Sequence, residues 1–392
     1  MGCKLTTLLL EIGVENVDAV GRDAVGRGKG STPLCLAASA VCFGNAGAGG
    51  LELAKLLLIK KGANVNAVGS DRGGGYEITA LLWAAKAVLS AQEGGLELAK
   101  LLIEKGANVN AVDEDGGTAL FWAAIAVRNG RKSGLELAKL IVVVKGADVN
   151  VVGTNVGDDV KCTPIWWAVL ATCKCEAGGL ELVKLLVQNG ADVNAVGIDG
   201  EANNEGTSLW LVAYEMSVGW PGWDGGLELA MFLIENGADV NAAGKRRIHE
   251  ETTPLMWGAM AVHNRVEGGL GLVTLLAEKG ADMNAVAKLE AGGGSTALWM
   301  AVQWLHYGNA HVIELAKLLV EKGADANAVG TDVDGSECTP LLLAATAVKF
   351  MKDAGMEMVR LLLSAGAKLA DAESELQPHV DEILGNWVGR CM

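Results

Sequence analysis

Residues that could do chemistry are few in this chain, and their spacing forms no recognisable catalytic or metal site. None of the five histidines has a partner at the spacing of the HExxH zinc motif. Cys173 and Cys175 form the sequence CKC, and Cys162 lies eleven residues earlier. Zinc sites use wider cysteine pairs and need four ligands, so we interpret these as loop thiols. We therefore predict no metal and no cofactor.

A glycine-rich segment, GRGKGST at residues 26–32, superficially matches a phosphate-binding loop. The match fails because Gly30 separates Lys29 from Ser31, and because no strand precedes the segment. With no nucleophile, base or phosphate loop in place, we predict that the chain is not an enzyme.

The sequence MGCKLT at the N-terminus matches a pattern for lipid attachment. Gly2 follows Met1 and Thr6 occupies the small hydroxyl position of the myristoylation motif, while Cys3 matches the second, palmitoylated site of doubly acylated proteins. Two lipid signals hold a protein stably at a membrane, whereas one holds it marginally. The alternative is that Met1 is an arbitrary fragment start, or that the host lacks the transferase.

Composition excludes several other classes of protein. The net charge of −15 disfavours nucleic acid, which requires a cationic stripe. The apolar runs are too short for a membrane span. The eight cysteines do not recur at one repeat position, so we expect reduced thiols and a cytoplasmic location rather than a disulfide framework.

The chain is dominated by internal repetition. One recurring segment, such as TPLCLAA or TALFWAA, begins with threonine every 39 to 47 residues. A second, KGANVNA or NGADVNA, follows each of these segments. Repetition at this period is typical of a solenoid. The threonines of the first segment are Thr32, Thr79, Thr118, Thr163, Thr207, Thr253, Thr296 and Thr339.

Each repeat predicts two helices, a short link and a long loop. Thr followed by Pro is an N-cap followed by the favoured first helical residue. The second helix, as in LELAKLLIEK at 96–105, has one broad apolar face, and Gly106 provides its left-handed end. The Glu of GLELA recurs in layer after layer, which indicates a solvated framework position rather than a general base.

The segments TPLxxAA, GLELAKLL and GADVNA resemble those of the ankyrin repeat, over roughly residues 1–370. The resemblance implies an all-α, ankyrin-like solenoid with long hairpin-like loops. We expect a half-repeat and first loop at 1–31, eight repeats forming one solenoid at 32–370, and a polar C-terminal cap with a short helix at 371–392. The resemblance also implies that the recurring asparagines stabilise the loops by hydrogen bonds from side chain to backbone.

Two departures from the family concern the repeat itself. The period exceeds the usual value of about 33 residues, which indicates a longer first helix or an enlarged link. The family's histidine after TPL is absent, so we expect apolar stacking to replace the usual polar bridge between repeats. The residues at this position are Cys35, Leu82, Phe121, Trp166, Trp210, Met256, Trp299 and Leu342.

Tryptophans fall into two groups. One repeat position holds Trp83, Trp122, Trp167 and Trp257, which we interpret as a buried ladder and only secondarily as a binding strip. Trp220 and Trp223, in GWPGWDGG, follow no repeat rule. They either cover a local gap or form an exposed aromatic anchor, since tryptophan is enriched at interface hot spots. Trp304 and Tyr307 allow the same two interpretations.

The family implies that partners bind a concave face made by the loops and first helices. The long loops carry more than half of the net charge of −15, which predicts a monomeric chain and a partner protein with a basic surface. A surface that merely confers solubility is the alternative. The basic segment GKRRIHEE breaks the pattern and predicts contact with an acidic spot. The candidate binding residues are Asp113, Glu114, Asp115, Asp158, Asp159, Trp220, Trp223, Lys245, Arg246, Arg247, Asp332 and Asp334.

These observations predict a non-enzymatic scaffold for protein–protein interaction, located in the cytoplasm or, if acylated, at a membrane. The alternative is a regulatory or targeting fragment of a larger ankyrin-containing enzyme or channel.

Overall fold

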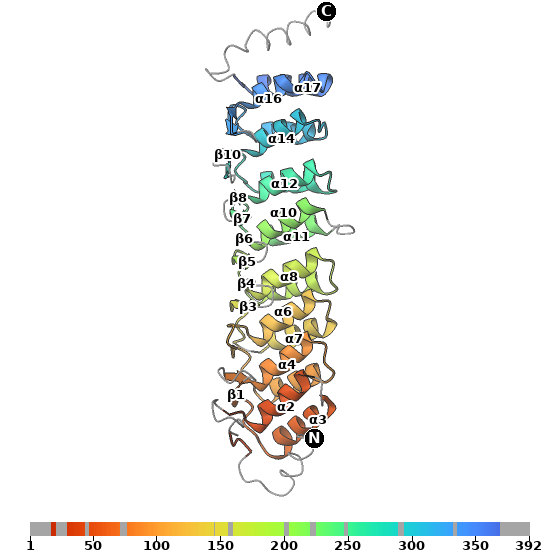
Figure 1. Cartoon of the computed structure of the whole chain (residues 1–392), viewed down its shortest axis with the longest axis vertical. Coiled ribbons are helices and arrows are strands. Elements are labelled where there is room, and N and C mark those ends of the chain that lie inside the picture. The colour runs from red at the N-terminus through yellow and green to blue at the C-terminus, as the bar shows by residue number, and fades with distance from the viewer. Residues whose placement is uncertain are drawn as a thin grey trace, which may run out of the picture. The chain divides into compact units, whose positions relative to one another are not determined.

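The computed structural model describes residues 17–20, 30–43, 47–70, 77–144, 146–155, 160–199, 204–219, 225–246, 250–288, 294–331 and 335–368. The chain divides into two compact units, unit 1 at 1–201 and unit 2 at 202–392. Each unit repeats one arrangement of helix, link, helix and hairpin (Figure 1).

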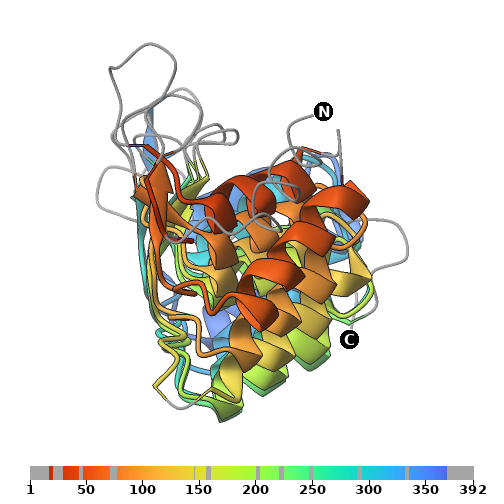
Figure 2. The same cartoon turned by 90° about the horizontal axis from the view of Figure 1, so that it is seen from below.

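Unit 1 contains paired helices that stack on one another in two rows (Figure 2). The first helices of its repeats are α2 (Pro33–Cys42), α4 (Ala80–Leu89), α6 (Ala119–Arg128) and α8 (Pro164–Cys173). The second helices are α3 (Gly47–Lys55), which continues as the π-helical turn η1 (Leu56–Lys60), then α5 (Gly95–Glu104), α7 (Lys132–Val142) and α9 (Gly179–Gln188). The strands are β1 (Val68–Ser70), β2 (Glu77–Thr79), β3 (Gly153–Asn155), β4 (Val160–Cys162) and β5 (Gly197–Asp199).

Unit 2 follows the same plan. Its first helices are α10 (Ser208–Val218), α12 (Pro254–His263), α14 (Ala297–His306) and α16 (Pro340–Ala347). Its second helices are α11 (Gly226–Glu235), α13 (Gly269–Glu278), α15 (Val312–Glu321) and α17 (Lys352–Ser364). Its strands are β6 (Asn204–Gly206), β7 (Gly244–Arg246), β8 (Glu250–Thr252), β9 (Ala287–Lys288), β10 (Gly294–Ser295), β11 (Gly330–Thr331) and β12 (Glu337–Cys338).

The long loops form antiparallel hairpins, which corrects the all-α class expected from the sequence. Strand β3 pairs with β4 and β7 with β8, each hairpin lying just before a first helix. Neighbouring hairpins also pair, as β4 with β5 and β8 with β9. The pairing arises because each long loop leaves the helix stack and returns alongside itself, so its backbone groups satisfy one another.

The recurring threonine begins each first helix as the sequence predicts. The hydroxyl of Thr79 accepts a hydrogen bond from the backbone N–H of Leu82 at 3.4 Å, and that of Thr118 accepts from Phe121 at 3.3 Å. The helices that follow are almost wholly apolar and buried, because each packs against its own second helix and the first helices of adjacent repeats. Short links join these first helices to the second helices. The residues that enlarge the repeat period are shared between the links and the hairpins.

The GG pair before the second helix has two separate physical causes. Gly94 has φ of +84°, a left-handed conformation that suits glycine. A Cβ on Gly95 would lie 2.9 Å from that of Ala87 and 3.1 Å from backbone atoms of α4. The second glycine is therefore required by close contact between the two helices of one repeat.

The recurring asparagine bridges successive repeats. Asn110 donates from Nδ2 to the carbonyl of Gly146 at 2.7 Å, and its Oδ1 accepts from the backbone N–H of Asp148 at 2.8 Å. Asn284 makes the equivalent pair of bonds with Gly323 and Asp325 in unit 2. These contacts confirm the expected bonds from side chain to backbone and show that they join one repeat to the next.

The Glu of GLELA belongs to a ladder of exposed ion pairs along the second helices. Lys55 Nζ lies 2.9 Å from Glu97 Oε1 of the following repeat, and Lys317 Nζ lies 2.7 Å from Glu357 Oε1. The two carboxylates beside Lys317 raise its pKa to about 12. These glutamates are thus framework residues, as the sequence indicates, and each exposed pair contributes little stability.

In three layers a donor of another type replaces the family's histidine, which corrects the expectation of apolar stacking there; the indole N–H of Trp166 has no partner among the described residues, and the other positions are apolar as expected. Trp210 Nε1 donates to the carbonyl of Thr252 at 3.0 Å, and Trp299 Nε1 donates to that of Cys338 at 2.9 Å. The Cys35 thiol lies 3.5 Å from the carbonyl of Ile78. All three acceptors immediately precede the threonine of the next repeat, so the polar bridge is kept by an indole or a thiol.

Candidate partner-binding face

The hairpins and first helices of unit 1 hold a buried charge cluster, the Lys86 layer, made of Lys86, Asp113 and Trp122. Asp113 lies in the loop between Asn110 and Thr118, which is the shortest of the long loops. Its side chain is only 2% exposed, and its Oδ2 lies 2.8 Å from Lys86 Nζ. The same oxygen accepts from Trp122 Nε1 at 2.8 Å.

The Lys86 layer is saturated from within. The second oxygen of Asp113, Oδ1, accepts from the backbone N–H groups of Gly117 at 2.9 Å and Asp115 at 3.2 Å. The ammonium of Lys86 also lies 4.6 Å from the centre of the Trp122 ring. Asp113 is therefore a structural residue of its loop, and its burial corrects the expectation that its carboxylate faces a partner.

The two acidic neighbours of Asp113 differ from it in exposure. Glu114 is exposed and Asp115 is half-buried. Burial raises the pKa of Asp115, the negative charge of Asp113 raises it further, and Lys86 opposes both effects. Of this acidic run, Glu114 is the side chain best placed to meet a partner.

In unit 2 the corresponding arrangement is the Arg246 layer, made of Arg246, Tyr214 and Trp257. The guanidinium carbon of Arg246, on β7, lies 5.7 Å from the ring centres of both Tyr214 and Trp257. The two rings meet edge to face at 5.0 Å, and Tyr214 stacks on Trp210 at 5.5 Å. Arg246 and Tyr214 are half-buried, while Trp257 is 6% exposed.

Other charges on the unit 2 hairpins pair across the strands. Lys245 Nζ lies 3.1 Å from Glu205 Oε2, and Lys288 Nζ lies 2.6 Å from Glu251 Oε2. Lys288, by hydrogen bond and charge, lowers the pKa of the Glu251 carboxyl. The predicted basic residue Lys245 is therefore exposed but already occupied, whereas Arg246 rests on aromatic rings.

Several predicted site residues lie outside the described residues: Asp158, Asp159, Trp220, Trp223, Arg247, Asp332, Asp334, Gly2 and Cys3. The four ladder tryptophans are at most 6% exposed, as expected for core residues. Trp304 is also buried and stacks on His263 at 4.5 Å, while Tyr307 is 58% exposed. Burial lowers the pKa of His263.

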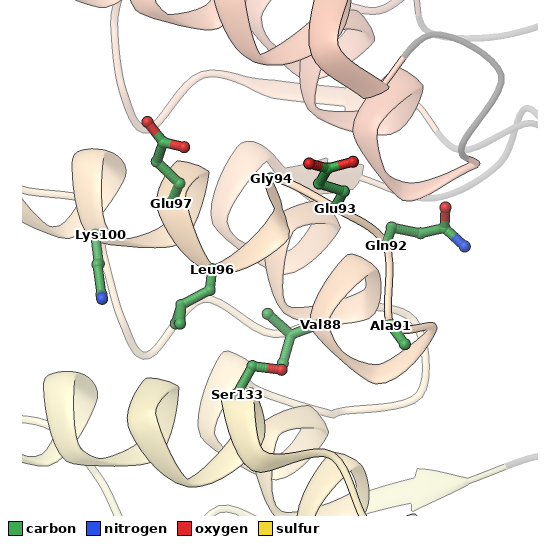
Figure 3. Close-up of a pocket in the computed structure, with 9 residues that line it drawn as sticks. All are labelled: Val88, Ala91, Gln92, Glu93, Gly94, Leu96, Glu97, Lys100 and Ser133. Atoms are coloured by element: carbon green, nitrogen blue, oxygen red, sulfur yellow. The ribbon is translucent and has the colours of Figure 1, made fainter.

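A surface hollow of about 590 Å³ lies between the links of two repeats in unit 1. Figure 3 draws the residues that line it, among them Val88, Leu96 and Ser133. Its lining combines aliphatic side chains with the charged side chains of Glu93, Glu97 and Lys100.

No group of three or more His, Cys, Asp or Glu residues in the described ranges is arranged to hold a metal. None of the described helices is both long and apolar enough to cross a membrane.

Sequence reasoning missed Lys86 and Tyr214, which occupy the same position seven residues after the repeat threonine. A signal was present for Lys86, which is the only charged residue in α4, but not for Tyr214, since α10 also contains Glu215 and two serines. The repeat pattern could not reveal which loop residue Lys86 or Tyr214 would contact.

The stacked helix pairs and paired hairpins define a repeat protein whose layers are joined by side-chain bridges. The family model described as ankyrin repeats (3 copies) matches residues 43–153, 81–197 and 261–372. The chain belongs to the ankyrin-repeat family, whose repeats generally mediate protein–protein interaction. A comparison with curated proteins gives no match.

Proposed function

We propose that this chain is a non-enzymatic scaffold that binds a partner protein on its hairpins and first helices. The observation that carries the proposal is the regular presentation of charged hairpin residues from a frame fixed by the asparagine bridges. Pre-ordered side chains lose little conformational entropy on binding. The presence of Glu114, Lys245 and Arg246 on this face supports recognition of a partner by charge.

The partner we propose has a mainly basic surface, because the long loops carry more than half of the net charge of −15. Charge complementarity acts mostly on the association rate and weakens with added salt. We expect the scaffold to be a monomer in solution and to bind the partner as a single chain. The alternative, a fragment that regulates or targets a larger enzyme or channel, uses the same binding face.

Affinity capture from native lysate, followed by mass spectrometry, identifies the partner. Binding is then measured for Glu114→Gln on the proposed face and for Glu136→Gln, an exposed acid on the second helices. We expect slower association for Glu114→Gln alone, and slower association of the wild type at higher salt. Equal rates for both variants together with no salt dependence would contradict the proposed face.

We also propose that Gly2 and Cys3 are acylated, which would bring the scaffold to a membrane. The test is expression of the reading frame in a eukaryotic cell with alkyne-tagged myristate, beside Gly2→Ala and Cys3→Ser. Label on the wild type and its loss from Gly2→Ala are expected. A wild type that takes up no label and stays soluble overturns the proposal.

A further inference from the structure

The Arg246 layer contains two hydrogen-bond donors that lack an acceptor within the described residues. The indole Nε1 of Trp257 is buried and has no partner there. Arg246 makes no ion pair with any described residue, although its neighbour Lys245 does. Buried indole N–H groups without an acceptor also occur at Trp166 and Trp167 in unit 1, whereas Arg246 is half-buried and can meet a group from outside, so Arg246 is the donor that requires an explanation.

The Lys86 layer shows what is missing. Trp122 and Trp257 occupy the same repeat position, and Lys86 and Tyr214 occupy another. In unit 1 one carboxylate, Asp113, accepts from the indole and pairs with the cation. In unit 2 the cation and the indole are both present, but an internal carboxylate that serves them is absent from the described part of the layer.

We propose that the Arg246 layer binds a carboxylate side chain of the partner protein, which pairs with the Arg246 guanidinium as Asp113 pairs with Lys86 in unit 1. The guanidinium of Arg246 lies beside two aromatic rings, which offer it no acceptor oxygen, and a guanidinium can bind a carboxylate by two parallel hydrogen bonds. This inference rests on the proposed function and assigns one chemical group to part of the binding face.

The surroundings of Arg246 favour one carboxylate over a polyanion. Glu205 and Glu251 stand on adjacent strands of the same hairpin surface and would repel a nucleic acid or polyphosphate. A partner segment with one acidic residue among basic ones satisfies Arg246 and tolerates the nearby glutamates. Such a segment also agrees with the mainly basic surface proposed for the partner.

The test uses peptides selected from a random display library on the full-length chain. Selected peptides are synthesised with their acidic residue and with the matching amide, and their dissociation constants are measured for wild type, Arg246→Gln, Arg246→Lys and Lys245→Gln. Lys245→Gln is the matched control, since it removes the adjacent cation. Urea unfolding confirms that each variant is folded.

We expect selected peptides to contain Asp or Glu, and Arg246→Gln to weaken their binding about tenfold or more, as for a hydrogen bond to a charged group. Arg246→Lys should fall between wild type and Arg246→Gln, because it keeps charge but loses the fork. The amide peptide should bind wild type and Arg246→Gln equally.

Three outcomes overturn the inference. Selected peptides without an acidic residue, or equal binding by Arg246→Gln, contradict it while leaving a peptide-binding scaffold in place. Equal losses for Lys245→Gln and Arg246→Gln assign the effect to general charge. Failure of the wild type to select any peptide counts against this inference and the proposed function together.

Discussion

The Lys86 layer and the Arg246 layer each place a cation beside the tryptophan of one repeat position, but among the described residues only the first adds a carboxylate. In the first, a cation rests on a tryptophan and a buried carboxylate completes the set. In the second, a cation rests on two aromatic rings, and its acidic counterpart is supplied by no described residue of the layer. The difference teaches that one short loop can close such a cation–aromatic layer with an internal carboxylate, because it brings Asp113 inside.

The largest expected effect tests the structural role of the Lys86 layer. Asp113→Ala leaves Lys86 and the Trp122 N–H without their shared acceptor, so we expect a loss of about 3 kcal/mol in the free energy of unfolding. Urea denaturation followed by tryptophan fluorescence measures it. Arg246→Gln is the comparison, and its loss should stay below about 1 kcal/mol, the scale of an exposed cation–aromatic contact. Equal losses would show that the two layers do not differ in kind.

A double-mutant cycle sharpens the same comparison. For Lys86→Met and Asp113→Asn we expect a coupling free energy of about 1 to 2 kcal/mol, because the pair is largely buried. The cycle of Arg246→Gln with Tyr214→Leu should give about half a kcal/mol, since it contains no ion pair. A stronger coupling free energy in unit 2 would contradict the structural role assigned to the Lys86 layer.

The two regions should also respond to pH with opposite signs. The pKa of Asp115 is raised in the folded state, so its proton is favoured there, and its contribution to stability falls as pH rises from the ordinary carboxyl range through the raised pKa. The pKa of Glu251 is lowered, so its contribution is present above its ordinary pKa and is lost as pH falls through the lowered one.

The measurement is unfolding by urea between acidic and neutral pH for Asp115→Asn and Glu251→Gln. Asp115→Asn should gain stability relative to wild type at neutral pH, and Glu251→Gln should lose a little, because that pair is exposed to solvent screening. A gain for both variants, or for neither, contradicts the assigned causes of the two shifts.

The smallest effect concerns the helix ends that both units share. Ala91, Cys175 and Arg265 have φ of 54°, 57° and 59°, where Gly130, Gly219 and Gly308 stand in other repeats. Replacing Ala91 or Arg265 with glycine should stabilise the chain by up to about 1 kcal/mol, because the left-handed conformation is strained for residues with a Cβ. Thermal unfolding measures the change, and Gly219→Ala is the reverse control. A clear gain in stability for the variant of one unit alone would mean that the helix ends of the two units differ, as the Lys86 and Arg246 layers do.

The sequence by itself determined the repeat, the threonine caps, the glycine ends and the ladder of buried tryptophans, because these depend on short-range spacing. It also indicated the asparagine bonds from side chain to backbone. Local chemistry suffices for such features, since their partners recur at fixed intervals.

Only the tertiary structure decided which charges are buried and which are presented. Asp113 and Glu114 are adjacent acids in one loop, yet the first faces Lys86 from the preceding repeat and the second faces outward. Arg246 and Lys245 are adjacent cations, yet one rests on Tyr214 and the other pairs with Glu205. These outcomes depend on contacts between residues 27 to 40 positions apart, and no pattern within a single repeat contains that information.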